Sequence, residues 1–345
     1  MVSQLDSLKK FSSVVADTGD IDSIQKFNPD DCTTNPSLIF KAVQSDKYKK
    51  LVDEVISNSK SRKFSQTEDQ VNYIADQLTI AFGIELTKIV PGYVSTEVDS
   101  DLSFNTEATV EKAKQIINSY EQSGIPKNRI LIKIAGTWEG IQAVKKLEAE
   151  GISCNCTLIF SLTQAIACAE AGAFLISPFV GRILDWFKSN TQKDYDSSND
   201  PGVESVEKIF NYFKKFNYNT IVMAASFRNK DEIINLAGCD KLTISPTLLE
   251  ELSQNDDEIK LKLSKENNQS FNITYGNART LLDAAQTIVK ITNSKSKIVD
   301  TGRNSLYPDR GTLNIDKARQ LVNYKPTMSL ENGLESYYGW LQNKI

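Results

Sequence analysis

Histidine is absent from this sequence of 345 residues. Its absence excludes Ser-His-Asp and Cys-His catalysis, histidine general bases and histidine-ligated metals together. If the chain is an enzyme, Lys, Arg, Asp, Glu, Ser and Thr side chains must carry the chemistry.

Long apolar runs and the common nucleotide-binding loops are absent too. No apolar run reaches the roughly 18 residues typical of a membrane span, and the opening MVSQLDSLKKFS does not resemble a secretory signal. No GxGxxG or Walker motif occurs, so nucleotide sites of those kinds are not expected. A net charge of −4 gives no general attraction to nucleic acid or anionic membrane. We therefore expect a cytoplasmic protein that binds neither.

Cysteine is scarce, with five residues in the chain. An odd number without signs of secretion favours reduced thiols over a disulfide framework. Cys154 and Cys156 suggest a metal pair, but no second pair and no histidine complete a site. We therefore interpret both as small core residues, and we expect no metal site.

Short β-rich runs alternate with helical stretches along most of the chain. The eight runs are 14–19, 32–35, 94–99, 129–136, 152–158, 174–180, 220–226 and 241–246. Helical periodicity fills segments such as 108–123 and 164–172, and a longer helical insert occupies 41–90. Strands that alternate with helices predict a parallel α/β fold, and eight of them favour a closed (β/α)₈ TIM barrel.

Polar side chains gather at the C-terminal ends of seven of these runs. They are Asp17, Thr33, Asn35, Glu97, Lys133, Asn155, Thr157, Ser177 and Ser226. The active sites of barrel enzymes are assembled at that end of the strands. This concentration of polar groups predicts a catalytic site.

Lys133 lies within the apolar run RILIKIAG, where Ile130, Ile132, Ile134 and Ala135 are expected to desolvate it. A desolvated lysine amine can attack a ketone and form a Schiff base. The alternative is a lysine that only forms a salt bridge, for example with Glu97.

Carboxylates and arginines near the same strand ends suggest further roles. Asp17 and Glu97 are candidate proton carriers, although each could instead pair with Lys133. Arg182 and Arg228 follow the sixth and seventh strands, and with Ser226 they could clamp a phosphate. The alternative for each arginine is a solvated surface role.

The segments DDCTTNPSLIFKA, VSTEVDSDLSFNTEAT, ILIKIAGTWEGIQA and SPFVGRILDW closely resemble the transaldolase family of the pentose phosphate pathway. The resemblance covers about residues 3–264 and implies a barrel domain over 1–264. Tyr93, Gly136 and Cys32 depart from the family's usual residues, but none removes a catalytic group.

The resemblance also implies a role for each matching residue. Lys133 would form the Schiff base, Asp17 would act as acid and base, and Glu97 would activate a water with help from Thr157. The dihydroxyacetone fragment would contact Asn35, Asn155 and Ser177, with the Phe179 ring beside the nucleophile. Arg182, Ser226 and Arg228 would bind the phosphate.

The implied reaction transfers dihydroxyacetone from sedoheptulose 7-phosphate to glyceraldehyde 3-phosphate, giving erythrose 4-phosphate and fructose 6-phosphate. It requires no cofactor. Two alternatives stay open: a variant acting on another sugar phosphate or a sugar-nucleotide precursor, and a non-catalytic scaffold that binds a sugar nucleotide or a protein partner. Whether the chain forms a homodimer also stays open.

The remaining residues, 265–345, resemble the C-terminal part of NAD-dependent sugar-nucleotide epimerases and dehydratases, without the Rossmann half. The polar stretch 265–270 suits a module boundary, and helices are expected at 279–291, 314–322 and 330–343. In that family, the arginine matching Arg310 often contacts nucleotide phosphates. This α-rich tail is either an accessory module that covers the barrel or mediates assembly, or a weak nucleotide-sugar or partner site.

Overall fold

The computed structural model describes residues 2–264, 272–302 and 311–344. The chain divides into two compact units, the first reaching Asn268 and the second beginning at Gln269. The expected boundary stretch 265–270 and Arg310 lie outside the described residues.

The first unit is a closed barrel of eight parallel strands in sequence order. Its strands are β1 Ser13–Asp17, β2 Asp31–Thr33, β3 Val94–Glu97, β4 Ile130–Ala135, β5 Cys154–Ile159, β6 Leu175–Pro178, β7 Ile221–Ala224 and β8 Lys241–Ile244. Each lies within or overlaps one of the predicted runs. Pairing of β1 with β8 closes the sheet, which confirms the (β/α)₈ barrel.

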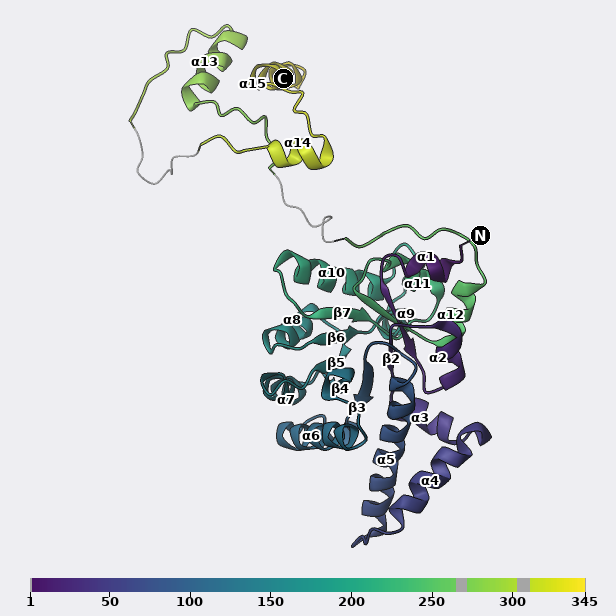
Figure 1. The fold of residues 1–345 in the computed structure, drawn as a ribbon. Coiled ribbons are helices and arrows are strands. Elements are labelled where there is room, and N and C mark those ends of the chain that lie inside the picture. Colours follow the sequence, from purple (N-terminus) through teal and green to yellow (C-terminus); the bar gives the residue numbers. More distant parts are fainter. Residues whose placement is uncertain (1, 265–271, 303–310, 345) are drawn as a thin grey trace. The chain divides into compact units, whose positions relative to one another are not determined.

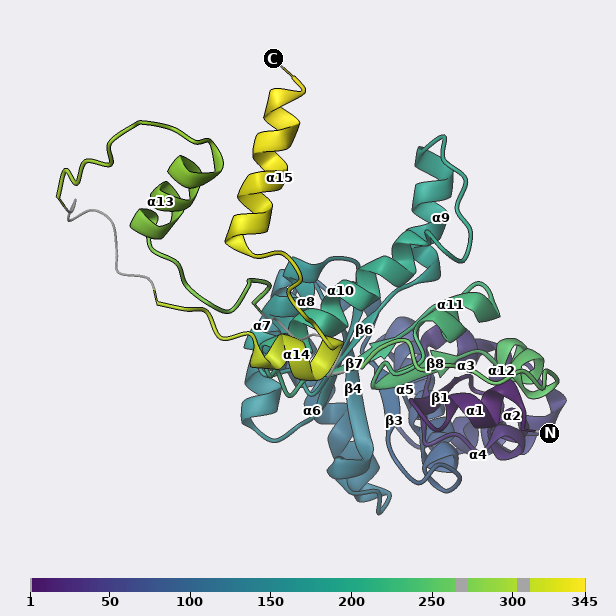
Figure 2. The same cartoon turned by 90° about the horizontal axis from the view of Figure 1, so that it is seen from above.

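Helices surround the barrel, with α1 before the first strand and the others after the strands (Figure 1). They are α1 Gln4–Leu8, α2 Ile21–Phe27, α3 Pro36–Val43, α6 Thr106–Gln122, α7 Trp138–Ala149, α8 Leu162–Glu170, α9 Gly181–Asn190, α10 Pro201–Lys215, α11 Lys230–Asn235 and α12 Pro246–Ser253. Figure 2 gives a second view, in which α6, α7 and α8 again lie along one side. Three short 3₁₀ turns occur at Asp46–Tyr48, Ser100–Leu102 and Lys127–Arg129.

Short polar side chains begin several helices directly after a strand. Asn35, Thr137 and Ser161 accept hydrogen bonds from the first-turn N–H groups of α3, α7 and α8. Pro36 occupies the first turn of α3, and Gly172 follows α8 with a left-handed φ of 84°. Proline at the start of a helix and glycine just past its end are the residues that favour such boundaries.

The insert between β2 and β3 contains α4 Lys49–Ser59 and α5 Thr67–Thr87, which extend beyond one side of the barrel in Figure 1. The base of α5 packs against β3. The rings of Tyr48 and Phe82 meet edge to face at 5.1 Å, where the insert joins the barrel.

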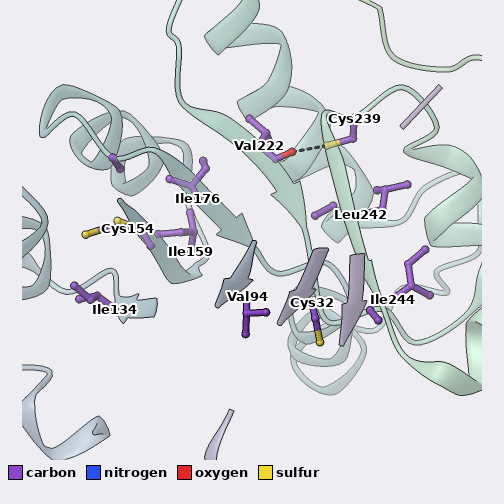
Figure 3. Packing of buried hydrophobic residues seen from close by; sticks show 14 of the residues in the cluster. Cys32, Val94, Ile134, Cys154, Ile159, Ile176, Val222, Cys239, Leu242 and Ile244 are labelled. Carbon is purple, nitrogen blue, oxygen red and sulfur yellow. Dashed lines mark hydrogen bonds between the residues drawn. The ribbon is translucent and has the colours of Figure 1, made fainter. Parts of the chain in front are cut away.

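Two apolar layers stabilise the barrel. The larger lies between strands and helices and includes outward side chains such as Ile134, Ile176 and Leu242 (Figure 3). A smaller cluster of Val15, Leu131, Leu175 and Met223 forms separately. Strand side chains alternate between the two faces.

This alternation corrects one expectation about Lys133. Ile132 and Ile134 adjoin it in sequence, but their side chains belong to the outer layer. Lys133 instead shares its face of β4 with Leu131, from the smaller cluster. Its burial therefore comes from the barrel interior and not from its immediate neighbours in the chain.

All five cysteines are free and buried. Cys154 and Cys156 belong to the outer layer, which confirms them as core residues. No helix in the described parts of the chain is long and apolar enough to cross a membrane.

The second unit, described over 272–302 and 311–344, is helical as expected. It contains α13 Leu281–Ile291, α14 Asp316–Val322 and α15 Leu330–Gln342. Thr280 and Asp283 form a capping box at the start of α13. Arg279 pairs with Glu331 at 2.7 Å, and α13 contacts α15.

Candidate active site

A cavity of about 110 Å³ lies at the C-terminal end of the barrel, with walls from seven strands or the residues that follow them. The lining residues are Asp17, Thr33, Asn35, Lys133, Thr157, Ser177, Phe179, Arg182, Met223, Ala225, Ser226 and Thr243. Eight of the eleven predicted site residues are among them. Glu97, Asn155 and Arg228 are not, although each contacts a residue of the site.

Lys133 and Glu97 form an ion pair across neighbouring strands. They are direct partners in the β3–β4 register, and Lys133 Nζ lies 3.0 Å from Glu97 Oε2. Nζ also donates to the Thr34 carbonyl oxygen at 3.2 Å. The two side chains are only 11% and 20% exposed, so water screens the pair weakly. The salt bridge left open as an alternative therefore exists, and it holds the amine at the cavity.

Asp17 ends a hydrogen-bond chain that begins on β8. The Thr33 hydroxyl donates to Asp17 Oδ1 at 2.9 Å and lies 2.7 Å from the Thr243 hydroxyl. Because Thr33 has one hydroxyl hydrogen, Thr243 must be the donor to Thr33. Burial raises the pKa of the Asp17 carboxyl, while the charge of Lys133 and the Thr33 hydrogen bond oppose that shift.

Thr243 was not among the predicted site residues. The sequence could have indicated Thr243, because it lies near the end of β8, the one strand to which no polar end group had been assigned. Position alone did not show that it contacts Thr33 across the closure of the barrel.

Asn155 supports Ser177 from behind the cavity. It is fully buried, accepts from the Ser177 hydroxyl at 2.6 Å and donates to the Ser95 hydroxyl at 3.2 Å. The structure thus places Asn155 where it orients Ser177, outside the cavity lining.

Two buried oxygens near Lys133 lack a hydrogen-bond partner among the described residues. One is the Thr157 hydroxyl, and the other is Glu97 Oε2, whose contact with Lys133 meets an ion-pair distance only. Buried polar atoms in folded proteins nearly always have a partner, commonly an ordered water. These atoms are therefore suited to bind a water or a ligand hydroxyl.

Phe179 supplies an apolar wall to the cavity. Its ring meets Phe160 edge to face at 5.5 Å, and the Arg182 guanidinium lies 5.0 Å from its ring centre. The cation–π contact holds Arg182 over the cavity wall, with its donors still available to an anion.

Arg228 is held beside the cavity by Asp185. Two of its nitrogens donate to Asp185 Oδ2 at 2.7 and 3.0 Å, and a third donates to the Ser226 hydroxyl at 3.3 Å. Ser226 has a left-handed φ of 62°. A Cβ on Gly181 would lie 2.5 Å from Arg228 Cγ, so glycine allows α9 to begin against this loop.

The fold and these contacts together define a (β/α)₈-barrel enzyme with a buried lysine–carboxylate pair at the C-terminal ends of its strands. A family model described as Transaldolase/Fructose-6-phosphate aldolase matches residues 14–296. The chain belongs to the transaldolase/fructose-6-phosphate aldolase family.

Individual relatives agree with this assignment. A protein named Transaldolase from Shewanella sp. (strain ANA-3) is 55% identical over 263 residues, which cover 76% of this chain and 82% of that protein. Another from Cellvibrio japonicus (strain Ueda107) is 54% identical over 268 residues, or 77% of this chain and 84% of that protein. The family resemblance expected for the barrel is confirmed. The domain boundary near residue 264 and the epimerase resemblance of the tail stay predictions.

Proposed function

We propose that this chain is a cytoplasmic transaldolase that transfers dihydroxyacetone from sedoheptulose 7-phosphate to glyceraldehyde 3-phosphate. The observation that carries the proposal is the position of Lys133. Its amine lies in a cavity at the C-terminal end of the barrel, paired with Glu97 at 3.0 Å and near the buried Asp17 carboxyl. An amine between two carboxyl groups has both the nucleophile and the proton carriers that Schiff-base chemistry needs.

The reaction begins when the Lys133 amine gives up a proton to a neighbouring carboxylate and attacks the C2 ketone of the donor sugar. The carbinolamine that forms loses water, and the protonated Schiff base withdraws electrons from the neighbouring carbons. Asp17 then removes the proton of the C4 hydroxyl, the C3–C4 bond breaks, and erythrose 4-phosphate leaves. The electron pair of the broken C3–C4 bond stays on the three-carbon fragment, which remains bound to Lys133 as an enamine.

The second half reverses these steps with a new aldehyde. The enamine attacks C1 of glyceraldehyde 3-phosphate, and Asp17 returns its proton to the oxygen formed there. Water then hydrolyses the Schiff base, which releases fructose 6-phosphate and regenerates Lys133. The raised pKa of Asp17 suits a carboxyl that must both accept and return a proton.

A catalytic water is assigned to the space between Glu97 and Thr157. The buried Thr157 hydroxyl and Glu97 Oε2 lack hydrogen-bond partners in the described residues, so a water there would satisfy both. Glu97 would accept a proton from that water during hydrolysis. The Phe179 ring limits further water near the enamine.

The three-carbon fragment is assigned to Asn35 and Ser177, which line the cavity near Lys133. Asn35 Oδ1 already accepts from Leu38 N at 3.0 Å, which leaves its amide nitrogen as the donor to a sugar hydroxyl. Asn155 acts indirectly, because its amide oxygen accepts a hydrogen bond from the Ser177 hydroxyl.

The phosphate is assigned to Arg182, Ser226 and Arg228. Arg228 forms its bond to Asp185 with side chains that are 41% and 53% exposed, so the pair is screened and readily exchanged. A phosphate dianion is a stronger partner for a guanidinium than this exposed carboxylate.

The direct test is a coupled assay with fructose 6-phosphate as donor and erythrose 4-phosphate as acceptor. We expect glyceraldehyde 3-phosphate to form only when both sugars are present, and free dihydroxyacetone not to accumulate. Release of dihydroxyacetone without an acceptor would make the chain an aldolase. No turnover with these or other sugar phosphates would favour a non-catalytic scaffold.

A further inference from the structure

Glu232 lies directly behind the proposed phosphate site. It is on α11, which starts two residues after Arg228, and it is only 1% exposed. Its Oε2 accepts from the backbone N–H of Arg228 at 2.7 Å, and its own N–H donates to Asn229 Oδ1 at 3.0 Å. The two bonds close a tight turn, so the position of Arg228 depends on this carboxyl group.

The other oxygen of Glu232 has no hydrogen-bond partner within the described parts of the chain. The acid that acts on Glu232 is Asp200, which is 6% exposed and caps α10 through bonds from Gly202 N and Val203 N. A Cβ on Gly202 would lie 2.1 Å from the Val180 carbonyl oxygen, so α10 begins in tight contact with the end of β6. Glu232 and Asp200 also line one cavity of about 290 Å³.

Two buried carboxyl groups this close cannot both ionise without a large cost. Asp200 already uses its carboxylate to accept two N–H bonds, so Glu232 is the member that takes the proton. Burial raises the pKa of Glu232 to about 7, and the charge of Asp200 acts in the same direction while Arg228 opposes it.

The other charged groups around Glu232 do not neutralise it. Those that line the same cavity or bind Arg228 are Asp185, Lys188, Asp196 and Asp231, while Lys230 at the start of α11 is paired with Glu251. Three of these four are acids, and Asp185 already binds Arg228. A phosphate placed on Arg228 would therefore add negative charge to a region that is already acidic.

We propose that Glu232 is a positioning residue of the phosphate site, and that it takes up a proton when a sugar phosphate binds beside Arg228. This inference rests on the proposed assignment of the phosphate site. Neutral Glu232 keeps its bond to the Arg228 backbone, because a carboxyl oxygen still accepts, and it removes the charge that competes with phosphate for the guanidinium. The proton comes from solvent and returns when the sugar leaves.

Linkage turns this proton uptake into a pH dependence of binding. Affinity should fall as pH rises through about 7, where Glu232 loses its proton in the free protein. The second ionisation of the phosphate, with a pKa of about 6, acts in the opposite direction. A variant that lacks the Glu232 carboxyl keeps the effect of phosphate ionisation, so comparison with it isolates the effect of Glu232.

The experiment is calorimetry with glucitol 6-phosphate, which has a phosphate but no carbonyl to react with Lys133. Binding is measured at pH 6.5 and 8.5, and at pH 7 in two buffers of different ionisation enthalpy. Relative to Glu232→Gln, the wild-type Kd should rise about three- to ten-fold over this pH range. The wild type should also take up a measurable fraction of a proton that Glu232→Gln does not.

Two further variants make the test specific. Asp231→Asn removes an acid from the exposed side of the same turn and should keep the wild-type pH dependence. Asp200→Asn removes the charge that opposes ionisation of Glu232, so the pH dependence should move to lower pH. Wild-type proton uptake in Glu232→Gln, or equal loss of it in Asp231→Asn, would overturn the inference.

Failure of the underlying site gives a different result. If glucitol 6-phosphate does not bind the wild type, or binds Arg228→Ala equally well, the phosphate site itself is wrong and the inference falls with it. If it binds through Arg228 with no effect of Glu232→Gln, only the inference is overturned.

Discussion

The two sides of the cavity are built differently. On one side, Lys133, Glu97 and Asp17 project from strands, and the barrel register sets their separation. On the other, Arg182 and Arg228 follow strands, and their present partners are a ring and an exposed carboxylate. Strands hold the groups that must meet reacting atoms in one geometry, whereas the first turn of α9 and the loop after β7, together called the loop side, hold a phosphate that must bind and leave.

This comparison predicts that changes on the strand side affect kcat and changes on the loop side affect KM. The largest effect should come from Lys133→Met. Removal of an enzyme nucleophile costs on the order of 10⁴-fold or more in kcat. The coupled assay measures it, with the exposed Lys208→Met on α10 as a control that should keep wild-type activity. More than a few per cent of wild-type kcat in Lys133→Met would contradict the assignment.

Asp17→Asn should give the next largest loss. A misplaced or missing general acid–base group lowers kcat by about 10²- to 10⁴-fold. Because burial raises the pKa of Asp17, wild-type kcat should fall on acidification at a pH above the ordinary carboxyl value of 3.8. Protonation removes the base, so the rate is lost as pH falls through this pKa.

Thr33→Val tests whether Asp17 is the group that gives the acid limb of the pH–rate profile. It removes the hydrogen bond that favours the Asp17 carboxylate, so the acid limb of the pH–rate profile should move to higher pH. An acid limb that stays in place in Thr33→Val would show that another group titrates there.

Arg228→Ala tests the loop side. Loss of a charge-assisted hydrogen bond of about 1.5–3 kcal/mol should raise KM for fructose 6-phosphate about 10- to 100-fold. Turnover of unphosphorylated fructose, which lacks the group that Arg228 is proposed to bind, should change little. Lys230→Ala is the matched control, because it also removes a cation. Lys230 lies two residues from Arg228 and is paired with Glu251 at 3.7 Å. Equal losses with both sugars would mean that Arg228 supports the fold and not phosphate binding.

Glu232→Gln should change stability in a pH-dependent way. The pKa of Glu232 rises from 4.5 to about 7 on folding, so its contribution to stability is present below about 4.5 and lost as pH rises through about 7. At about 1.4 kcal/mol per pKa unit, the variant should gain about 1–3 kcal/mol over wild type at pH 8.5 and little at pH 5. Urea unfolding at the two pH values measures this, and a pH-independent difference would contradict it.

The smallest effect should come from Asp185→Asn. An exposed ion pair contributes about 0–1 kcal/mol, so freeing Arg228 should lower KM for fructose 6-phosphate by a few-fold at most. A rise in KM would mean that Asp185 positions Arg228 for phosphate instead of competing for it.

Sequence patterns predicted the strand side more completely than the loop side. Short β-rich runs between helical segments located all eight strands, and the positions of strand ends placed Lys133 and Asp17 at one cavity. These inferences succeed because a parallel barrel brings the same end of every strand together.

Sequence patterns did not predict the contacts between residues that are far apart in the chain. The bond between Arg228 and Asp185 joins residues 43 positions apart, and the Thr33–Thr243 contact spans 210. Burial of Asn155 behind Ser177 depends on side-chain packing, which periodicity does not describe. The desolvation of Lys133 was assigned to the wrong neighbours for the same reason.

The central claim is that Lys133 forms a Schiff base with the donor sugar. Borohydride reduction in the presence of fructose 6-phosphate, followed by peptide mass spectrometry, tests it directly. We expect a reduced three-carbon adduct on the peptide that contains Lys133 and none on Lys133→Met. No adduct on the wild type, or an equal adduct on Lys133→Met, would contradict the claim.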